Sequence, residues 1–554
     1  MSLPAFRLTR DLEAMTRGVF DLVIIGGGIT GSCIARDAAL RGLSVALVEK
    51  NDFSHATSSA TSKLVHGGLR YLKNFEFGLI RESLRERRIW ERIAPHLVYP
   101  LPFIVPVTRG NSATKMLGMG LTLYDLLSFD RGWLEDADQR LPRHRRLSSA
   151  EAAGVEPVLA GEGLEGAYLY YDCQMYAPER LGLACLVDAA RAGARIANHT
   201  EVSSFLRDGH AIKGVRVTDR ITGKTHDISG AVTINAAGPW ADIVMGAAEG
   251  GEASHGLIRS KGIHIITRKL VSTHALALVA PKSHLFVLPW RGFTIIGTTD
   301  TVFTGPPESV RPTEADIAGL IATTNALLPN AGLTRADVKA AYAGLRPLVD
   351  DGSKDSYGAS RKSEVFDHEA EEGLKGLISA VGGKWTTSRN LAEKVLGVAS
   401  KRLGRKLPRG RTASLPLGGA GTGNFRTFLA EAQKRHPALA PATINVLARN
   451  YGAAMDEVLA PVVDAPDLAR SLSNELPDIA AEIAYAATHE MAMTLEDALF
   501  RRTGIATLGH PGKSALETAA AIMARHHHWT VERTRAEIAA VEARLHIPDE
   551  AVAA

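Results

Sequence analysis

The chain has 554 residues, of which 45% are hydrophobic and 22% are charged, and its 64 Lys and Arg against 60 Asp and Glu give a formal net charge of +4. This composition is typical of a folded globular protein and excludes a disordered or collagen-like chain. So small a net charge argues against nucleic acid as the main partner. The cysteines, Cys33, Cys173 and Cys185, form no C-x-x-C pair, so we expect neither a disulfide framework nor a cysteine-ligated metal.

The first strong pattern lies near the N-terminus. An apolar run predicts a strand over 22–25, which leads directly into G-x-G-x-x-G at 26–31. Small residues predict a helix over 32–42, and a second apolar run predicts a strand that ends at Glu49. This is the dinucleotide-binding pattern, in which glycines admit a pyrophosphate and the acid accepts hydrogen bonds from a ribose, although the pattern alone does not distinguish NAD from FAD. Cofactor contacts are predicted at Gly26, Gly28, Gly31 and Glu49.

A polar segment follows, from Thr57 to Tyr71. Hydroxyl and ammonium side chains crowd residues 57–63, and paired glycines follow at 67–68. Hydroxyls, backbone amides and one lysine are good partners for a pyrophosphate, whereas the alternative is a Ser/Thr loop that caps the next helix. Cofactor contacts are predicted here at Thr57, Ser58, Ser62, Lys63, Gly67 and Gly68.

Two later strands also end in small residues. One predicted strand runs into A-A-G-P-W at 236–240, and another runs into G-G-K at 382–384 and then a helix that begins with hydroxyl residues. A helix N-terminus of this kind stabilises negative charge. Three strand-to-glycine junctions so far apart in the sequence predict a cofactor longer than one βαβ unit holds, which favours non-covalently bound FAD over NAD. The contacts predicted at the two later junctions are Ala237, Gly238, Gly383, Lys384, Thr386 and Thr387.

The composition also divides the chain. Up to Arg402 the sequence keeps returning to strand-like apolar runs, for example at 215–218 and 285–288, which predicts a large α/β or α+β unit. Residues 403–423 are rich in Gly, Pro and basic side chains and are predicted to be a linker. Helical spacing in the Ala-, Glu- and Arg-rich residues 424–554 predicts a helical C-terminal domain.

Together these motifs resemble those of the FAD-dependent glycerol-3-phosphate dehydrogenases of the aerobic, quinone-linked type, which are D-amino-acid-oxidase-like flavoproteins. The resemblance also rests on I-R-S-K-G-I-H at 258–264, I-I-G-T-T-D at 295–300 and G-L-R-P-L at 344–348, and more weakly on D-A-L and R-R-T between 497 and 503. The departures from the family pattern are the N-terminal extension 1–20, Ala237, Trp385 and Ser388.

The resemblance implies a Rossmann-like FAD-binding domain interleaved with a β-sheet substrate domain, and a C-terminal helical cap domain. The implied FAD-binding segments are about 21–90, 165–255 and 345–402, and the substrate-binding segments are about 91–164 and 256–344. The implied reaction is oxidation of sn-glycerol 3-phosphate to dihydroxyacetone phosphate by hydride transfer to the flavin, with electrons passed to a membrane quinone. Alternatives left open are a glycerol-3-phosphate oxidase that uses O2, a D-amino-acid-type flavin oxidase and a non-catalytic flavin-binding sensor.

The resemblance also implies the residues of the substrate site. A glycerol phosphate needs fixed cations, and arginine is the preferred bidentate donor. Substrate contacts are implied at Arg70, Tyr71, Thr298, Arg346, Arg361 and Lys384. Removal of the hydroxyl proton requires a base or a strongly polarising cation, so catalytic roles are implied for His66, the favoured base, and for Arg346. The alternatives are that His66 only contacts the flavin or packs in its loop, and that any one of the cations forms a structural or surface ion pair.

A further pattern concerns the membrane. Residues 117–129 predict an apolar helix, and a basic run follows at 140–146. The two would suit an anionic membrane surface, although an ordinary core-facing helix explains the apolar run equally well. With no predicted secretory signal or membrane-spanning segment, we expect a cytoplasmic protein that is peripheral on the inner face of the cell membrane, and a homodimer. The three histidines at 526–528 predict a solvated helical face, and no metal site is expected.

Overall fold

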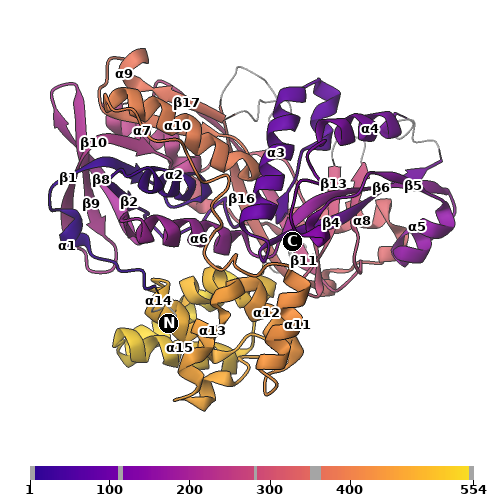
Figure 1. Ribbon diagram of the computed structural model, residues 1–554. Helices are drawn as coiled ribbons and strands as arrows, with labels where there is room; N and C mark the ends of the chain where they lie inside the picture. Colours follow the sequence, from indigo (N-terminus) through magenta and orange to yellow (C-terminus); the bar gives the residue numbers. More distant parts are fainter. Residues whose placement is uncertain are drawn as a thin grey trace, which may run out of the picture.

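The computed structural model describes residues 6–109, 116–251, 253–279, 284–349, 363–473 and 475–547. Two β-sheets and the helices that cover them form the upper part of the molecule in Figure 1, and the C-terminal helices form a lobe beneath them. The predicted α/β and α+β class, with a helical C-terminal domain, is confirmed.

The first sheet carries the dinucleotide pattern. Its strand order is β17-β18-β10-β1-β2-β7, and β1, β2, β7, β10 and β18 run parallel. The β1 strand is apolar and fully buried over Leu22–Ile24, as expected for a strand covered on both faces. The strands of this sheet are β1 (Val19–Ile25), β2 (Val45–Val48), β7 (Arg195–Ala197), β8 (Thr200–Asp208), β9 (Ala211–Asp219), β10 (Thr225–Asn235), β17 (Ser363–Asp367) and β18 (Leu377–Gly382).

Three helices cover one face of this sheet. They are α2 (Ile29–Leu40), α6 (Pro178–Arg191) and α10 (Ser388–Arg402), which pack against one another and share a single apolar core with β1 and β2. Small residues let α2 approach the sheet closely, as the sequence predicts, because Ala35 and Ala38 are fully buried. On the opposite face, α1 (Leu12–Met15) and α7 (Ala241–Glu249) lie near β8–β10.

The second sheet is mostly antiparallel and has the order β15-β11-β14-β13-β12-β4-β6-β3, with β16 paired to β11 and β5 to β6. One face packs on α3 (Phe77–Ile93) and α4 (Leu117–Leu127), and the other packs on α5 (Ser149–Val155) and α8 (Glu314–Leu327). Its strands are β3 (Leu64–Val65), β4 (Val98–Thr108), β5 (Arg145–Leu147), β6 (Leu164–Met175), β11 (Leu257–Thr267), β12 (Ala275–Val279), β13 (His284–Trp290), β14 (Phe293–Gly297), β15 (Thr301–Val302) and β16 (Val338–Val349).

The topology shifts two of the predicted segment boundaries. The segment 165–255 was assigned to the FAD-binding domain, but β6 pairs with β4 along its length, from Val98↔Met175 to Thr108↔Leu164, and so belongs to the second sheet. Residues 345–349 also belong to the second sheet, because they continue β16 alongside β11. Antiparallel pairing over such lengths is a long-range property that the local sequence pattern does not reveal.

Residues 403–423, the predicted linker, pack against the helices of the first sheet. Arg36 on α2 donates hydrogen bonds to the carbonyl oxygens of Thr412 and Leu415, and the Leu417 amide donates to the Ile93 carbonyl. Thr412 and Leu417 are both buried. The segment therefore attaches the C-terminal lobe along a defined path.

The C-terminal lobe is helical, as predicted. Its helices are α11 (Phe425–Arg435), α12 (Pro441–Tyr451), α13 (Met455–Leu459), α14 (Ala480–His489), α15 (Lys513–His527) and α16 (Val531–Leu545). Small alanines such as Ala519 and Ala520 are fully buried and let α14, α15 and α16 approach one another. The N-terminal extension bridges the lobes, because the Leu8 amide donates to the His489 carbonyl and Arg10 pairs with Asp219. Among the described residues, the helices are all too short or too polar to span a bilayer.

Candidate active site

The three strand-to-glycine junctions meet at one edge of the first sheet. Strands β1, β10 and β18 are neighbours in the order β18-β10-β1 and run parallel, with Ile24 opposite Ile234 and Ile234 opposite Ile378. Their carboxyl ends therefore lie side by side, which is where ligands bind in sheets of this kind. The geometry joins motifs that lie more than a hundred residues apart in the sequence.

The first junction has the shape that a pyrophosphate requires. Gly26 has φ of +106°, and a Cβ there would lie 2.5 Å from the Ala236 carbonyl oxygen. Gly28 is the N-cap of α2 and has no side chain that could cap the helix. The N-terminus of α2 therefore offers backbone N–H groups to a bound anion. A Cβ at Gly31 would lie 1.9 Å from the Gly26 carbonyl oxygen, so this glycine serves the close approach of helix to strand.

Polar side chains hold the loop around this junction. Glu49 accepts hydrogen bonds from the Gly27 amide at 2.7 Å and from the Asn51 amide at 2.9 Å. Ser58 Oγ accepts from the Ile29 amide at 2.9 Å, so it ties the polar segment to the first turn of α2. These contacts place an acid and a hydroxyl at the two ends of the glycine turn.

A cavity of about 1120 Å³ runs from these junctions into the second sheet. The residues present fit an extended dinucleotide such as FAD, because the cavity walls combine three glycine junctions, a helix N-terminus and a carboxylate. The predicted site residues that line it are Gly26, Gly28, Glu49, Thr57, Ser58, Ser62, His66, Gly68, Tyr71, Ala237, Gly238, Thr298, Arg346, Gly383, Lys384 and Thr386.

Arg346 is held in place from the second sheet. It lies on β16 opposite Ser260 of β11, and its guanidinium donates to Thr298 Oγ1 at 2.7 Å and to Ser260 Oγ at 3.1 Å. A Cβ on Gly262 would lie 2.3 Å from Arg346 Nη2. Only a glycine at that position leaves room for the guanidinium, so the sheet is shaped around this cation.

A second cation stands at the third junction. Lys384 Nζ lies 3.8 Å from the centre of the Tyr71 ring and donates to Ser83 Oγ at 3.0 Å. Gly383 beside it has φ of +84°. His66 lies between β3 and the turn that carries Tyr71, and its backbone amide donates to Thr386 Oγ1. Lys384, Tyr71 and His66 all line the cavity, so the structure brings these predicted residues together with Arg346 on one surface.

His264 also lines the cavity, although the sequence did not predict it as a site residue. Its Nε2 is 2.8 Å from Ser62 Oγ, and its ring stacks on Tyr342 with 5.0 Å between ring centres. Burial, reinforced by the charges of Arg346 and Lys63, lowers the pKa of His264 to about 3, so the ring is neutral at pH 7. The I-R-S-K-G-I-H motif contained the signal, because β11 alternates and places His264 on the same face as Gly262.

Four predicted cofactor contacts do not line the cavity: Gly31, which packs α2 against β1, and Lys63, Gly67 and Thr387. Lys63 is 1% exposed and its Nζ donates to Glu179 at 2.9 Å and to the Ser59 carbonyl, so its charge is neutralised inside the protein. A Cβ at Gly67 would meet Tyr124 and Leu84, so this glycine serves packing. Thr387 is buried and its hydroxyl donates to the Lys384 carbonyl. Glycine and hydroxyl composition does not reveal which way each side chain faces.

Two predicted substrate residues are not located by the structure. Arg361 lies outside the described residues, and the described part of the turn Leu69–Asn74 does not include the side chain of Arg70. Both stay predictions.

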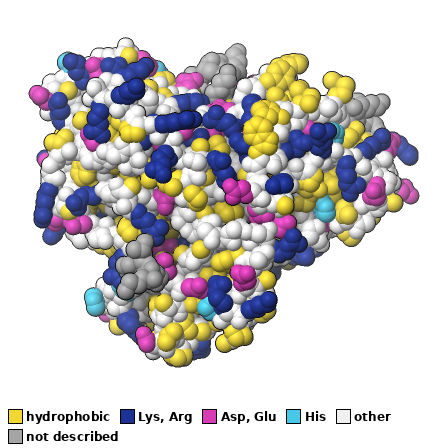
Figure 2. All heavy atoms as spheres, viewed as in Figure 1, with side chains coloured by type: hydrophobic (Ala, Val, Ile, Leu, Met, Phe, Trp, Pro, Cys, Tyr) yellow, Lys and Arg dark blue, Asp and Glu magenta, His cyan; other side chains and the backbone are white. Residues whose placement is uncertain are grey.

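The cavity continues into an apolar branch beneath α4. This branch is lined by Leu69, Leu72, Phe75, Phe103, Met119, Leu123 and Phe286, among others. At its rim, Phe75, Met116 and Met119 are 76%, 70% and 66% exposed. Figure 2 shows hydrophobic side chains standing on the upper rim of the molecule, with basic side chains around them. The same cavity thus joins a charged end to an exposed apolar surface.

The comparisons with known proteins agree with this architecture. Residues 21–389 match the family model described as FAD dependent oxidoreductase, and residues 410–534 match that of the C-terminal domain of alpha-glycerophosphate oxidase. The fold and site are therefore those of an FAD-dependent oxidoreductase.

Relatives of similar length narrow the family further. The chain is 36% identical over 545 residues to glycerol-3-phosphate dehydrogenase of Synechocystis sp., covering 96% of this chain and 97% of that one. It is 32% identical over 520 residues to aerobic glycerol-3-phosphate dehydrogenase of Staphylococcus aureus, covering 91% and 90%. The crystal structure of the Bacillus halodurans glycerol-3-phosphate dehydrogenase complexed with FAD superposes with a TM-score of 0.77 at 29% identity, covering 96% of each chain. The chain belongs to the FAD-dependent glycerol-3-phosphate dehydrogenase family.

Proposed function

We propose that this protein oxidises sn-glycerol 3-phosphate to dihydroxyacetone phosphate and passes the electrons to a membrane quinone. The observation that carries the proposal is the composition of one cavity, whose lining combines the three dinucleotide junctions, the cations Arg346 and Lys384, and exposed apolar side chains such as Phe75 and Met119. FAD, when bound, supplies the two-electron acceptor for the substrate's secondary alcohol.

The cations of the polar wall suit a phosphate-bearing substrate. Arg346 donates to two neutral hydroxyls, Thr298 Oγ1 and Ser260 Oγ, and a guanidinium is the preferred bidentate donor to a phosphate. Lys384 lies over the Tyr71 ring, donates to Ser83 Oγ and lines the cavity. Charge-assisted hydrogen bonds to phosphate are the strong contacts in such a site. Arg70 and Arg361 stay predicted substrate contacts in this proposal.

The proton of the substrate hydroxyl needs an acceptor. His66 lines the cavity beside the third junction, and histidine is the side chain whose ordinary pKa suits proton transfer near neutrality. Arg346 stays protonated and acts by stabilising negative charge on the substrate oxygen. In a His66→Gln variant, kcat/KM is expected to fall while FAD stays bound. A wild-type kcat/KM in this variant would remove His66 from this role.

An anaerobic substrate panel tests the reaction itself. Sn-glycerol 3-phosphate is expected to bleach the flavin absorbance, while glycerol and D-amino acids at the same concentration do not. Inorganic phosphate is expected to compete with the reduction. Bleaching by a D-amino acid, with no response to glycerol 3-phosphate, would overturn the proposal in favour of an amino-acid oxidase.

The electron acceptor is proposed from the apolar branch. A quinone ring and tail are apolar, and Phe75, Met116 and Met119 at the rim are largely exposed to solvent while Leu123 lines the interior. With glycerol 3-phosphate in air, a quinone analogue is expected to be reduced with little hydrogen peroxide formed. One peroxide per substrate oxidised, unaffected by added quinone, would instead identify an oxidase.

The same rim is proposed to rest on an anionic membrane. On α4 only Leu121 and Tyr124 are buried, so the helix is not an ordinary core element. Exposed Phe129 and Trp133 carry Arg81 and Arg88 over their rings, and Arg143, Arg145 and Arg146 are exposed nearby. Burial of apolar surface contributes about 25 cal/mol per Å², and each basic residue near anionic lipid adds about 1 kcal/mol.

Flotation with anionic liposomes tests the docking face. Wild-type protein is expected to float at low salt. Two variants are expected to float less: the double variant Met119→Asp with Leu126→Asp, and the triple variant Arg143→Glu with Arg145→Glu and Arg146→Glu. Val463→Asp is the control, because Val463 is an equally exposed apolar side chain in the C-terminal lobe. Wild-type protein that stays at the bottom would overturn membrane binding, and undiminished flotation of both variants would move the contact to another face.

A further inference from the structure

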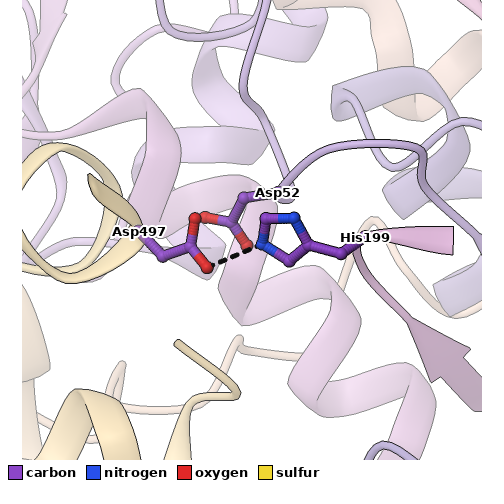
Figure 3. Close-up of side chains that lie close together, drawn as sticks. All are labelled: Asp52, His199 and Asp497. Atoms are coloured by element: carbon purple, nitrogen blue, oxygen red, sulfur yellow. Dashed lines mark hydrogen bonds and ion pairs between the residues drawn. The ribbon is translucent and has the colours of Figure 1, made fainter. Parts of the chain in front are cut away.

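A buried cluster of charged side chains joins the C-terminal lobe to the loop after β2. We call it the Asp52 network. It consists of Asp52 in that loop, Asn198 and His199 between β7 and β8, and Asp497, Arg501 and Arg502 of the helical turn η13 (Asp497–Arg502). Figure 3 shows Asp52, His199 and Asp497 pointing toward one another from three separate parts of the chain.

The hydrogen bonds of the network converge on Asp52, which is fully buried. Arg501 Nε and Arg502 Nη1 donate to its Oδ2 at 2.6 and 2.7 Å, and Arg502 Nη2 donates to its Oδ1 at 2.9 Å. Asn198 Nδ2 also donates to Oδ1, at 2.8 Å. Burial alone would raise the pKa of Asp52, but the two guanidinium groups outweigh it and hold that pKa below its ordinary value. The carboxylate is therefore charged and clamped by the C-terminal lobe.

The second carboxylate of the network is held in the same way. Asp497 Oδ1 accepts from Arg501 Nη2 at 2.6 Å, and its Oδ2 lies 2.8 Å from His199 Nε2 and accepts from the Met493 and Thr494 amides. Asp52, His199 and Asp497 are residue types that bind metals, and their ligand atoms lie within 4.8 Å of one another. Because arginine donors occupy both carboxylates, the cluster is a salt-bridge network and not a cation site.

The other face of the same loop borders the cofactor cavity. Glu49, Lys50 and Asn51 precede Asp52 and line the cavity, and His55 lines it from the far side. The backbone of the loop is tied to the network as well, because the His199 amide donates to the Asn51 carbonyl and the Thr200 amide donates to the Glu49 carbonyl, both at 2.7 Å. Only two residues, Lys50 and Asn51, separate Glu49, which holds the glycine turn, from the Asp52 carboxylate that the C-terminal lobe clamps.

Beyond Asp52 the loop returns to the glycine turn. The Ser54 amide donates to the Gly27 carbonyl at 3.0 Å, and a Cβ on Gly27 would lie 2.8 Å from the Phe53 ring. A displacement of Asp52 would therefore move both Glu49 and the residues that pack on the first junction.

We propose that the Asp52 network positions residues 49–58, the loop that borders the cofactor cavity, so that the C-terminal lobe helps to retain FAD. Asp52, Arg501 and Arg502 are positioning residues in this role, since Asp52 points away from the cavity and acts through Glu49 and the glycine turn. The inference depends on FAD being the cofactor and not on the identity of the substrate or acceptor.

Matched variants of two buried ion pairs test the proposal. Asp52→Asn and Arg502→Met disrupt the network, and Asp478→Asn is the control. Asp478 is fully buried and pairs with Arg291 at 3.1 Å, so it links the same C-terminal lobe to the second sheet, away from the loop. The readout is the dissociation constant of FAD, from flavin fluorescence released when the holoenzyme is diluted, together with the urea midpoint of each protein.

In the network variants the dissociation constant of FAD is expected to rise by about 5- to 150-fold, the usual range for coupled sites. The control variant is expected to lose stability and keep the wild-type FAD affinity. An unchanged FAD affinity in Asp52→Asn would overturn the proposal, and so would an equal loss in Asp478→Asn, since that would reflect docking of the lobe in general.

A measurement on the wild-type protein covers the case in which the variants do not fold. Coupling between two sites is reciprocal, so FAD must stabilise the network if the network stabilises FAD. Amide exchange in peptides covering 493–504 is expected to be slower in the holoenzyme than after removal of FAD, while peptides covering α12 exchange equally in both. Equal exchange of 493–504 in the two states would overturn the proposal.

Discussion

Gly262→Ala offers a direct test of how the second sheet positions Arg346. A Cβ at this position would lie 2.3 Å from Arg346 Nη2 and 2.7 Å from Thr298 Oγ1. Ordinary van der Waals contact begins at about 3.4 Å, so the guanidinium must retreat by roughly 1 Å, far enough to break a charge-assisted hydrogen bond. Because the clashing atoms are the end of the flexible Arg346 side chain and the Thr298 hydroxyl, and none of them is backbone, β11 and β16 are expected to stay paired and the protein to fold.

The expected cost is that of one lost charge-assisted contact, about 1.5 to 3 kcal/mol, which corresponds to a loss in kcat/KM of roughly 10- to 150-fold. The assay is anaerobic reduction of the flavin by glycerol 3-phosphate in stopped flow, with FAD content and the urea midpoint measured on the same preparation. Gly319→Ala in α8 is the control, because no atom lies within 4 Å of the added methyl. A folded, FAD-loaded Gly262→Ala variant with wild-type kcat/KM would refute the assignment of Arg346 to the substrate wall.

Three further predictions concern the cofactor, the substrate and the core. Gly28→Val places branched carbons at the start of α2, where even a Cβ lies 3.1 Å from Ser58 Oγ, so the purified protein is expected to lack FAD absorbance; stoichiometric FAD would contradict the loop's assignment. Arg346→Ala is expected to weaken glycerol 3-phosphate about 10- to 150-fold and glycerol far less, since a charge-assisted contact contributes about 1.5 to 3 kcal/mol, whereas equal losses would place Arg346 in the chemical step. Burial raises the pKa of Glu91 from 4.5 to about 7; folded-state stability is therefore lost as pH rises from about 4.5 to 7, by roughly 3 kcal/mol. Glu91→Gln avoids this loss, so urea titrations are expected to show a gain at pH 8 that shrinks toward pH 5, and an equal gain at both pH values would contradict it.

The sequence by itself determined the dinucleotide half of this protein. The local pattern predicted β1, α2, β2 and the acid Glu49. An apolar run, a glycine-rich segment and a small-residue segment follow one another there, and each favours one element: strand, turn and helix. The same is true of the three glycine junctions. A glycine in the sequence is informative because few other residues fit a position that has a positive φ or a close approach of another backbone segment.

Side-chain direction was beyond the reach of the sequence. Lys63 sits among hydroxyls in a segment that suits a phosphate, yet the fold turns it toward Glu179, 116 residues further along the chain. His264 belongs to the motif at 258–264, but the sequence does not show that it faces the cavity. The pairing of β11 with β14 and β16 places it beside Ser62. In both cases the deciding partner comes from a distant strand or helix, and local patterns carry no information about it.

The tertiary structure alone also decided which surface is exposed and which elements are joined. The apolar run at 117–129 suits a core helix and a surface helix equally well. The structure decides between them, because Leu121 and Tyr124 are buried in α4 while Met119 and Leu126 are exposed. The Asp52 network brings together residues 52, 199 and 497, which no spacing rule connects. Amino-acid composition and hydrophobic periodicity predict helices and strands because these elements depend on neighbouring residues. Burial and charge pairing depend instead on how distant segments pack together in the folded chain.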